Sequence, residues 1–103
     1  MADELRSLTD IDRLVHEPAR LLILTILSTV ESADFLFLQH ETGLTKGNLS
    51  AHLSKLEQAG YVKIKKTFKG KLPLTVCSVS DSGRQAFETY CRQMQSFIEH
   101  TQD

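Results

Sequence analysis

The most regular pattern of apolar and polar positions lies in the middle of the chain. Leucines recur there at spacings of four and three, which places them on one face of a helix: Leu49, Leu53 and Leu56. Thr45 is a residue type that caps helix N-termini, and Gly60 is one that ends helices. The pattern predicts a helix from about Lys46 to Ala59 with one apolar face and one small, polar face.

Two further helices are predicted in the first third of the chain. Pro18 suits the first turn of a helix, and apolar residues lie nearly all round the segment that continues to Leu27. We therefore expect a central core helix there. Closer to the N-terminus, Thr9 and Asp10 are candidate caps of a short helix that runs through Ile11, Leu14 and Val15.

The segment between these helices has a mixed pattern. Glu31–Asp34 has the composition of a loop, and Phe35–Leu38 is a short apolar run that fits either a strand or a helix. Gly43 is typical of a helix end. We favour one residue of edge strand followed by a helix from about Leu36 to Thr42.

The pattern changes to the period of a strand over Tyr61–Phe68. Val62, Ile64 and, less regularly, Lys66 fall on one side of it. Lys69–Pro73 has the residue types of a turn, and Leu74–Val79 is rich in strand-forming residues. Together they predict a hairpin with a basic tip.

A last helix is predicted from Asp81 or Ser80 as its cap to about residue 101. Its apolar residues form one stripe at spacings of three and four: Ala86, Phe87, Tyr90, Cys91, Met94, Phe97 and Ile98. Because the helix extends well past the hairpin, its second half is expected to pack against a second copy of the chain, with the N-terminal helix as partner. The elements predict an α+β, mainly helical fold.

Charge placement says more about function than net charge does. The 103 residues, enough for one domain, carry a net charge of −1. Between Lys46 and Lys71, however, seven lysines and one acid, Glu57, give +6, while five arginines and twelve acids give −7 elsewhere. A basic window of this kind indicates an anionic partner, although a solvated basic surface is the alternative.

The candidate chemical groups argue against an enzyme and against a cofactor. Cys77 and Cys91 have no metal-ligand spacing, and they are expected to be reduced thiols. His16, His40 and His100 are scattered, and His52, beside Leu53, is expected to be packed and hydrogen-bonded. No nucleophile–base pair can be identified. With no signal peptide or membrane span in the sequence, we expect a cytoplasmic protein that does not bind membranes.

Two short helices followed at once by a hairpin form a unit that can bind duplex DNA. A helix fits the major groove, which is about 12 Å wide, and a hairpin can then reach the backbone or the minor groove. From Asn48 to Val62 the chain reads Asn-Leu-Ser-x-His-Leu-x-x-Leu-Glu-x-Ala-Gly-Tyr-Val. With the hairpin segment Lys65–Lys71 and the exit Val79–Phe87, this resembles small single-domain winged helix-turn-helix regulators of the MarR/ArsR type. In that family the hairpin is called the wing.

The resemblance covers about Pro18 to Phe87 and, with the chain length, predicts a single domain over residues 1–103. Within it we expect the helix-turn-helix at about 35–60, the wing at about 61–79 and a dimerisation helix at about 81–101. The resemblance also implies a homodimer that places two recognition helices in successive major grooves. Relatives often carry arginine in the second wing strand around Pro73, where this chain has Leu72 and Leu74. The recognition helix also lacks the paired cysteines of metal-sensing members.

Two sets of residues are expected to carry these functions. Those expected to contact DNA are Thr45, Lys46, Gly47, Asn48, Ser50, Ala51, Ser54, Lys55, Lys65, Lys66, Lys69, Gly70 and Lys71. Those expected at the dimer interface are Leu5, Leu8, Ile11, Phe87, Tyr90, Cys91, Met94, Phe97 and Ile98. Among the first set, lysines favour phosphate and the small polar residues favour base edges.

The leading hypothesis is sequence-specific binding of double-stranded DNA by a homodimeric regulator of transcription. The alternative is a winged helix that serves as a protein-interaction module, with its basic face docked on an acidic partner. The small, polar residues of the recognition helix suit a DNA groove better than a protein interface. The sequence assigns no small-molecule effector.

Overall fold

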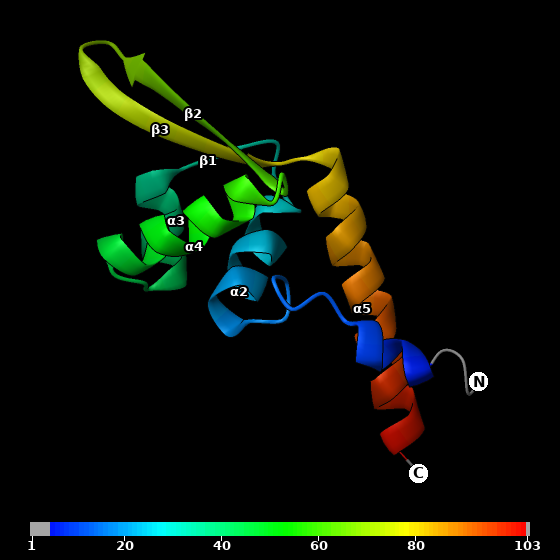
Figure 1. Cartoon of the computed structure of the whole chain (residues 1–103). Coiled ribbons are helices and arrows are strands. Elements are labelled where there is room, and N and C mark those ends of the chain that lie inside the picture. The colour runs from blue at the N-terminus through cyan, green and yellow to red at the C-terminus, as the bar shows by residue number, and fades with distance from the viewer. Residues whose placement is uncertain (1–4, 103) are drawn as a thin grey trace.

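The computed structural model describes residues 5–102, so Met1–Glu4 and Asp103, at the two ends of the predicted domain, lie outside the described residues. The elements follow the predicted order of helices, hairpin and helix (Figure 1). Their bounds are η1 Ser7–Asp10, α2 Pro18–Leu27, β1 Ala33–Asp34, α3 Phe35–Thr42, α4 Lys46–Gln58, β2 Val62–Lys69, β3 Leu72–Val79 and α5 Asp81–Thr101.

Helix α2 is the centre of the core, as its apolar residues predict. Glu17 caps it by accepting a hydrogen bond from the backbone N–H of Arg20 at 2.8 Å, and Pro18 occupies the first turn. Ile23, Leu24 and Leu27 are fully buried between α3, α4 and the sheet. Leu22 is 40% exposed, so the apolar ring around α2 is not covered on every side.

The predicted helix through Ile11, Leu14 and Val15 is wrong. The short 3₁₀ helix η1 ends at Asp10, and the chain turns instead of continuing as a helix. The cause is Asp12, whose carboxylate accepts hydrogen bonds from the backbone N–H groups of Leu14 and Val15 at 2.9 and 3.3 Å. A short acidic side chain that bonds its own backbone competes with a helix in this way.

The segment before α3 contains a two-residue strand. Ala33 and Asp34 pair antiparallel with Cys77 and Val76 of β3, so the edge strand lies earlier than expected and the predicted loop is shorter. Asp34 then caps α3 by accepting from the N–H of Phe37 at 2.8 Å, and this places Phe35 inside the helix.

The hairpin of β2 and β3 projects away from the helices (Figure 1). Its register runs from Val62 opposite Val79 to Lys69 opposite Leu72, and β1 lies on the far side of β3. The predicted five-residue turn is therefore too long: only Gly70, at φ 65°, and Lys71 connect the strands. Proline is tolerated within β3 at position 73 because β1 pairs only with Cys77 and Val76, which leaves an edge there.

Helix α5 leaves the sheet where the chain packs most tightly. Ser80 caps it by accepting from the N–H of Gly83 at 3.0 Å. A Cβ atom at Gly83 would lie 2.1 Å from the backbone oxygen of Tyr61, so only glycine lets the helix approach β2 this closely. Beyond this contact α5 runs past the core, with η1 beside its second half (Figure 1). Among residues 5–102, no helix is long and apolar enough to cross a membrane.

Candidate nucleic-acid interface

Helix α4 presents a polar surface from a fixed position. Thr45 caps it by accepting from the N–H of Asn48 at 3.1 Å, as predicted. Its leucines anchor it, with Leu49 and Leu56 at 0% and Leu53 at 2% exposure. The predicted DNA-contacting residues of this segment are all exposed: Thr45, Lys46, Gly47, Asn48, Ser50, Ala51, Ser54 and Lys55.

A buried arginine ties α4 to α2. Arg20 is 9% exposed, and its Nε donates to the backbone oxygen of Leu14 at 2.6 Å. Its Nη1 lies 3.2 Å from Nδ1 of His52; because a guanidinium can only donate, this nitrogen accepts. His52 is thus the packed, hydrogen-bonded residue that the sequence predicted, and it links α4 to α2.

Glu17 lies next to this contact, with its Oε2 3.6 Å from Nδ1 of His52. Burial by itself raises the pKa of this carboxyl, but hydrogen bonds from the backbone N–H groups of Arg20 and Ala19 and the charge of Arg20 outweigh it. The pKa of Glu17 therefore lies below its usual value, and the carboxylate stays ionised beside the guanidinium.

The wing, β2 and β3, has two faces that the register separates. Its inner face, which continues the core, carries Val62, Ile64, Lys66 and Phe68 with Val79, Cys77, Thr75 and Pro73. Its outer face carries Lys63, Lys65, Thr67 and Lys69 with Ser78, Val76, Leu74 and Leu72. The predicted wing lysines are therefore divided: Lys66 is on the inner face, Lys65 and Lys69 are on the outer face, and Lys71 is in the turn.

A hollow of about 300 Å³ separates α4 from the inner face of the wing. Its floor is apolar, and its polar lining consists of two ammonium groups, three hydroxyls and one carboxylate: Lys46, Lys66, Ser50, Ser54, Thr75 and Glu57. Two cations and three hydroxyl donors in one open hollow form a seat for an anionic oxygen such as that of a phosphate.

Sequence reasoning missed Thr75 and Glu57 as lining residues of this hollow. A signal for Glu57 was present, because Lys46, Ser50, Ser54 and Glu57 follow at spacings of four, four and three and so share a helix face. Thr75 had no such signal, since its position opposite Lys66 depends on the register of the hairpin.

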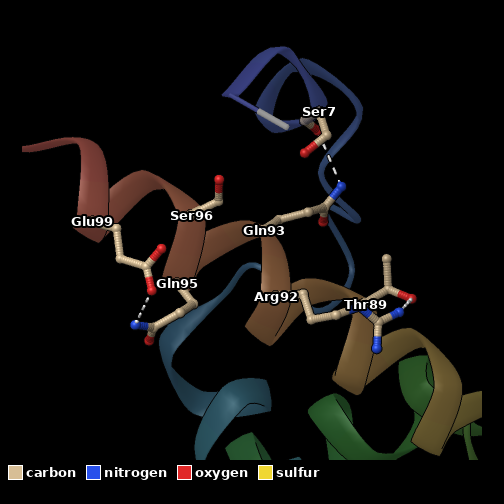
Figure 2. Close-up of a pocket in the computed structure, with 7 residues that line it drawn as sticks. All are labelled: Ser7, Thr89, Arg92, Gln93, Gln95, Ser96 and Glu99. Carbon is tan, nitrogen blue, oxygen red and sulfur yellow. Dashed lines mark hydrogen bonds between the residues drawn. The ribbon is translucent and has the colours of Figure 1, made fainter. Parts of the chain in front are cut away.

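A second surface lies at the chain termini. Gln93 of α5 donates from Nε2 to the backbone oxygen of Ser7 at 3.1 Å and so holds η1 against the helix (Figure 2). Leu5, Phe97 and Ile98 are 40%, 39% and 41% exposed. Most other residues predicted at the dimer interface are half-buried (Leu8, Ile11, Phe87 and Met94), and Cys91 is exposed. The open hollow in Figure 2 is lined by polar side chains.

Several residues of that set pack against the core of their own chain: Ile11, Phe87 and Met94 do so partly buried, and Tyr90 is the most buried. It is 6% exposed and packs in the core of its own chain, where its hydroxyl lies 2.8 Å from Nδ1 of His16. Burial raises the pKa of its phenol. Little of its surface remains for contact with a second chain.

The described residues contain no cluster of three or more His, Cys, Asp or Glu side chains that could hold a metal ion. Cys77 is buried in β3, as expected for a small strand residue, and Cys91 is exposed on α5. Burial, with the charges of Glu57 and Asp34, raises the pKa of the Cys77 thiol to about 11. This thiol is therefore protonated at neutral pH.

The sequence is similar to a known protein family and to a known protein. Residues 19–98 match the family model of the winged helix DNA-binding domain. An uncharacterized protein of Methanocaldococcus jannaschii, MJ0432, is 37% identical over 79 residues, which cover 76% of this chain and 85% of that protein.

Solved structures share the fold over nearly the whole chain. A transcriptional regulator homologue from Pyrococcus horikoshii OT3 aligns with a TM-score of 0.88 and 28% identity, over 98% of this chain and 99% of that one. A regulator of the MarR family from Enterococcus faecalis V583 aligns with a TM-score of 0.73 and 15% identity, over 92% and 88% of the two chains. The order of elements, the hairpin and the family match agree: this chain belongs to the winged helix DNA-binding domain family.

Proposed function

We propose that the chain acts as a homodimer that binds a specific double-stranded DNA site and thereby regulates transcription. The observation that carries this proposal is the hollow between α4 and the wing, with Lys46 and Lys66 on its two sides. In duplex DNA a sugar–phosphate ridge separates the major groove from the minor groove. A helix in one groove and a hairpin in the next must straddle that ridge, and the hollow matches its charge.

The exposed side chains of α4 take two roles in this arrangement. Asn48 can donate and accept hydrogen bonds at base edges, and Gly47 and Ala51 are small enough to permit close approach. Ser50 and Ser54, which line the hollow, have hydroxyls that can bind either a base edge or the phosphate. Lys46 and Lys55 bind phosphates, as Thr45 does at the helix N-terminus. Along the wing, Lys65, Lys66, Lys69, Gly70 and Lys71 follow the backbone.

The dimer forms through the chain termini. Leu5, Phe97 and Ile98 are apolar side chains about 40% exposed, and they lie on the part of the molecule where α5 has left the core. Burying them against a second copy, with the neighbouring Leu8, Ile11, Phe87, Cys91 and Met94, removes apolar surface from water. Two-fold symmetry then sets two recognition helices about 34–36 Å apart, one turn of DNA.

A salt titration tests the proposal. The wild-type protein is titrated with a duplex that it has selected from random-sequence DNA, at several salt concentrations between 50 and 200 mM. With six to ten phosphate contacts per dimer, the binding constant falls roughly 10³- to 10⁵-fold over that range. A mixed-sequence duplex binds more weakly. A flat response to salt, or equal affinity for both duplexes, would contradict the proposal.

A further inference from the structure

The tip of the wing exposes large apolar side chains where a basic surface alone would be expected. Phe68 is 68% exposed and Leu72 is 71% exposed, and with Leu36 they are the most exposed large hydrophobic residues described. Both lie within two residues of Gly70, at the far end of a hairpin that projects from the body (Figure 1). Two exposed apolar side chains therefore flank one turn, Phe68 on the inner face of the wing and Leu72 on the outer face.

The register places Phe68 relative to the hollow. Ile64, Lys66 and Phe68 follow one another along the inner face of the wing, and Ile64 and Lys66 line the hollow. Two residues along a strand span about 6.6 Å. Phe68 therefore lies two residues farther along β2 than Lys66, toward the tip of the wing. If Lys66 faces the phosphate ridge, Phe68 lies toward the next groove. That groove is the minor groove, which is about 6 Å wide.

The charges around the tip of the wing favour DNA as the partner that binds there. Lys66 precedes Phe68 on the inner face, Lys69 lies on the outer face and Lys71 lies in the turn, so the tip that carries the ring is basic on both faces. A minor groove has the complementary arrangement, with phosphates along its walls and stacked bases inside. The same tip on a second copy carries the same lysines, which would repel it. Pro73, opposite Phe68, stiffens the backbone behind the ring.

From this geometry we infer that Phe68 is an apolar wedge that enters the minor groove beside the recognition helix and bends the DNA. The inference rests on the proposed function. Apolar side chains that enter this groove partly unstack a base step and bend the duplex toward the major groove. Leu72, on the outer face, lines the groove wall. The wedge favours flexible pyrimidine–purine steps at the position it reaches.

The test measures the bend and the salt slope separately. A selected duplex of about 30 base pairs, long enough for two half-sites and their flanks, carries a fluorophore at each end, and energy transfer reports the end-to-end distance. Wild-type protein shortens that distance. Phe68→Ala abolishes most of the shortening and weakens binding about tenfold, but it leaves the slope of affinity against salt unchanged because no cation is lost. Phe68→Leu, which keeps an apolar side chain, retains most of the bend.

Matched variants keep the outcomes distinct. Lys66→Ala reduces the salt slope and keeps the bend, and Lys63→Ala, on the outer face at the wing's base, changes neither. DNA that stays straight while it is bound tightly by wild type overturns the wedge and leaves the proposed function intact. An undiminished bend with Phe68→Ala, or a loss of the dimer in sedimentation with that variant, also overturns it. No binding of DNA by wild type overturns both proposals.

Discussion

The end of the molecule formed by α4 and the wing differs in its exposed side chains from the end where η1 lies beside the second half of α5. At the α4–wing end, three buried leucines and the Arg20–His52 hydrogen bond fix the helix, and the outward side chains are lysines and hydroxyls. At the terminal end, α5 runs past the core and exposes Phe97 and Ile98. The first surface presents cations and hydroxyls from two elements of one chain, whereas the second leaves apolar side chains exposed. From this difference we expect that DNA binding and assembly can be disrupted separately, on either side of the first turn of α5.

The largest expected effect is on stability, from a substitution at the close contact between the first turn of α5 and Tyr61. Gly83→Ala places a Cβ atom against the backbone oxygen of Tyr61, 2.1 Å away, so α5 must shift from β2. We expect a loss of about 3 kcal/mol in the free energy of unfolding, measured by urea denaturation. Gly47→Ala is the control, because a Cβ there meets nothing within 4 Å and alanine stabilises a helix by roughly 0.5–1 kcal/mol. Equal stability of the two variants would contradict the role of Gly83.

The next effect separates assembly from folding. Phe97→Glu puts a charge on the terminal apolar surface, where the side chain is 39% exposed, so the monomer should keep its unfolding free energy. The dimer should dissociate in sedimentation, and affinity for a duplex with two half-sites should fall about 100-fold as avidity is lost. Gln85→Glu adds the same charge to an exposed position nearer the start of α5, and it should leave the dimer intact. An intact dimer with Phe97→Glu would place the assembly surface elsewhere.

The smallest effect concerns the acid in the hollow. Glu57 is the one carboxylate in the lining, so it repels a phosphate seated between Lys46 and Lys66. Glu57→Gln should raise affinity about threefold for every DNA sequence, as expected for a partly solvated charge, in titrations at low salt. Glu41→Gln, exposed on α3, removes the same charge elsewhere and should have no effect. If the two variants bind alike, phosphate does not occupy the hollow.

Sequence reasoning succeeded where structure is decided locally. Helix α4 was predicted to within a residue because its cap, its leucine spacing and its closing glycine all lie within its own turns. The N-terminal helix was wrong because the side chain of Asp12 bonds the backbone ahead of it, which an apolar spacing does not reveal. The hairpin was predicted, but the predicted turn was too long because proline is typical of turns. Pro73 lies within β3 instead, since the edge of the strand is unpaired there, which the sequence does not show.

The residues of the candidate interface stay a prediction, which rests on charge and on the periods of helix and strand. Six of the seven lysines of the basic window, all but Lys63, were predicted to contact DNA, and the strand period already placed Lys66 on the side of Val62 and Ile64, opposite Lys65. The position of Thr75 opposite Lys66, in contrast, depends on the pairing between the two strands. Tyr90 was assigned to the dimer stripe by its helical spacing, yet its contact with His16, 74 residues earlier, buries it in its own chain.

The most direct test of DNA binding across α4 and the wing is the salt slope of lysine variants. Each phosphate contact contributes about 0.9 to the slope of log affinity against log salt, and a dimer uses every contact twice. Lys46→Ala and Lys66→Ala, which remove the two ammonium groups of the hollow, should each lower the slope by about 1.8. Lys63→Ala should leave it unchanged. Slopes that fall equally with all three variants, or with none, would contradict DNA binding at this surface.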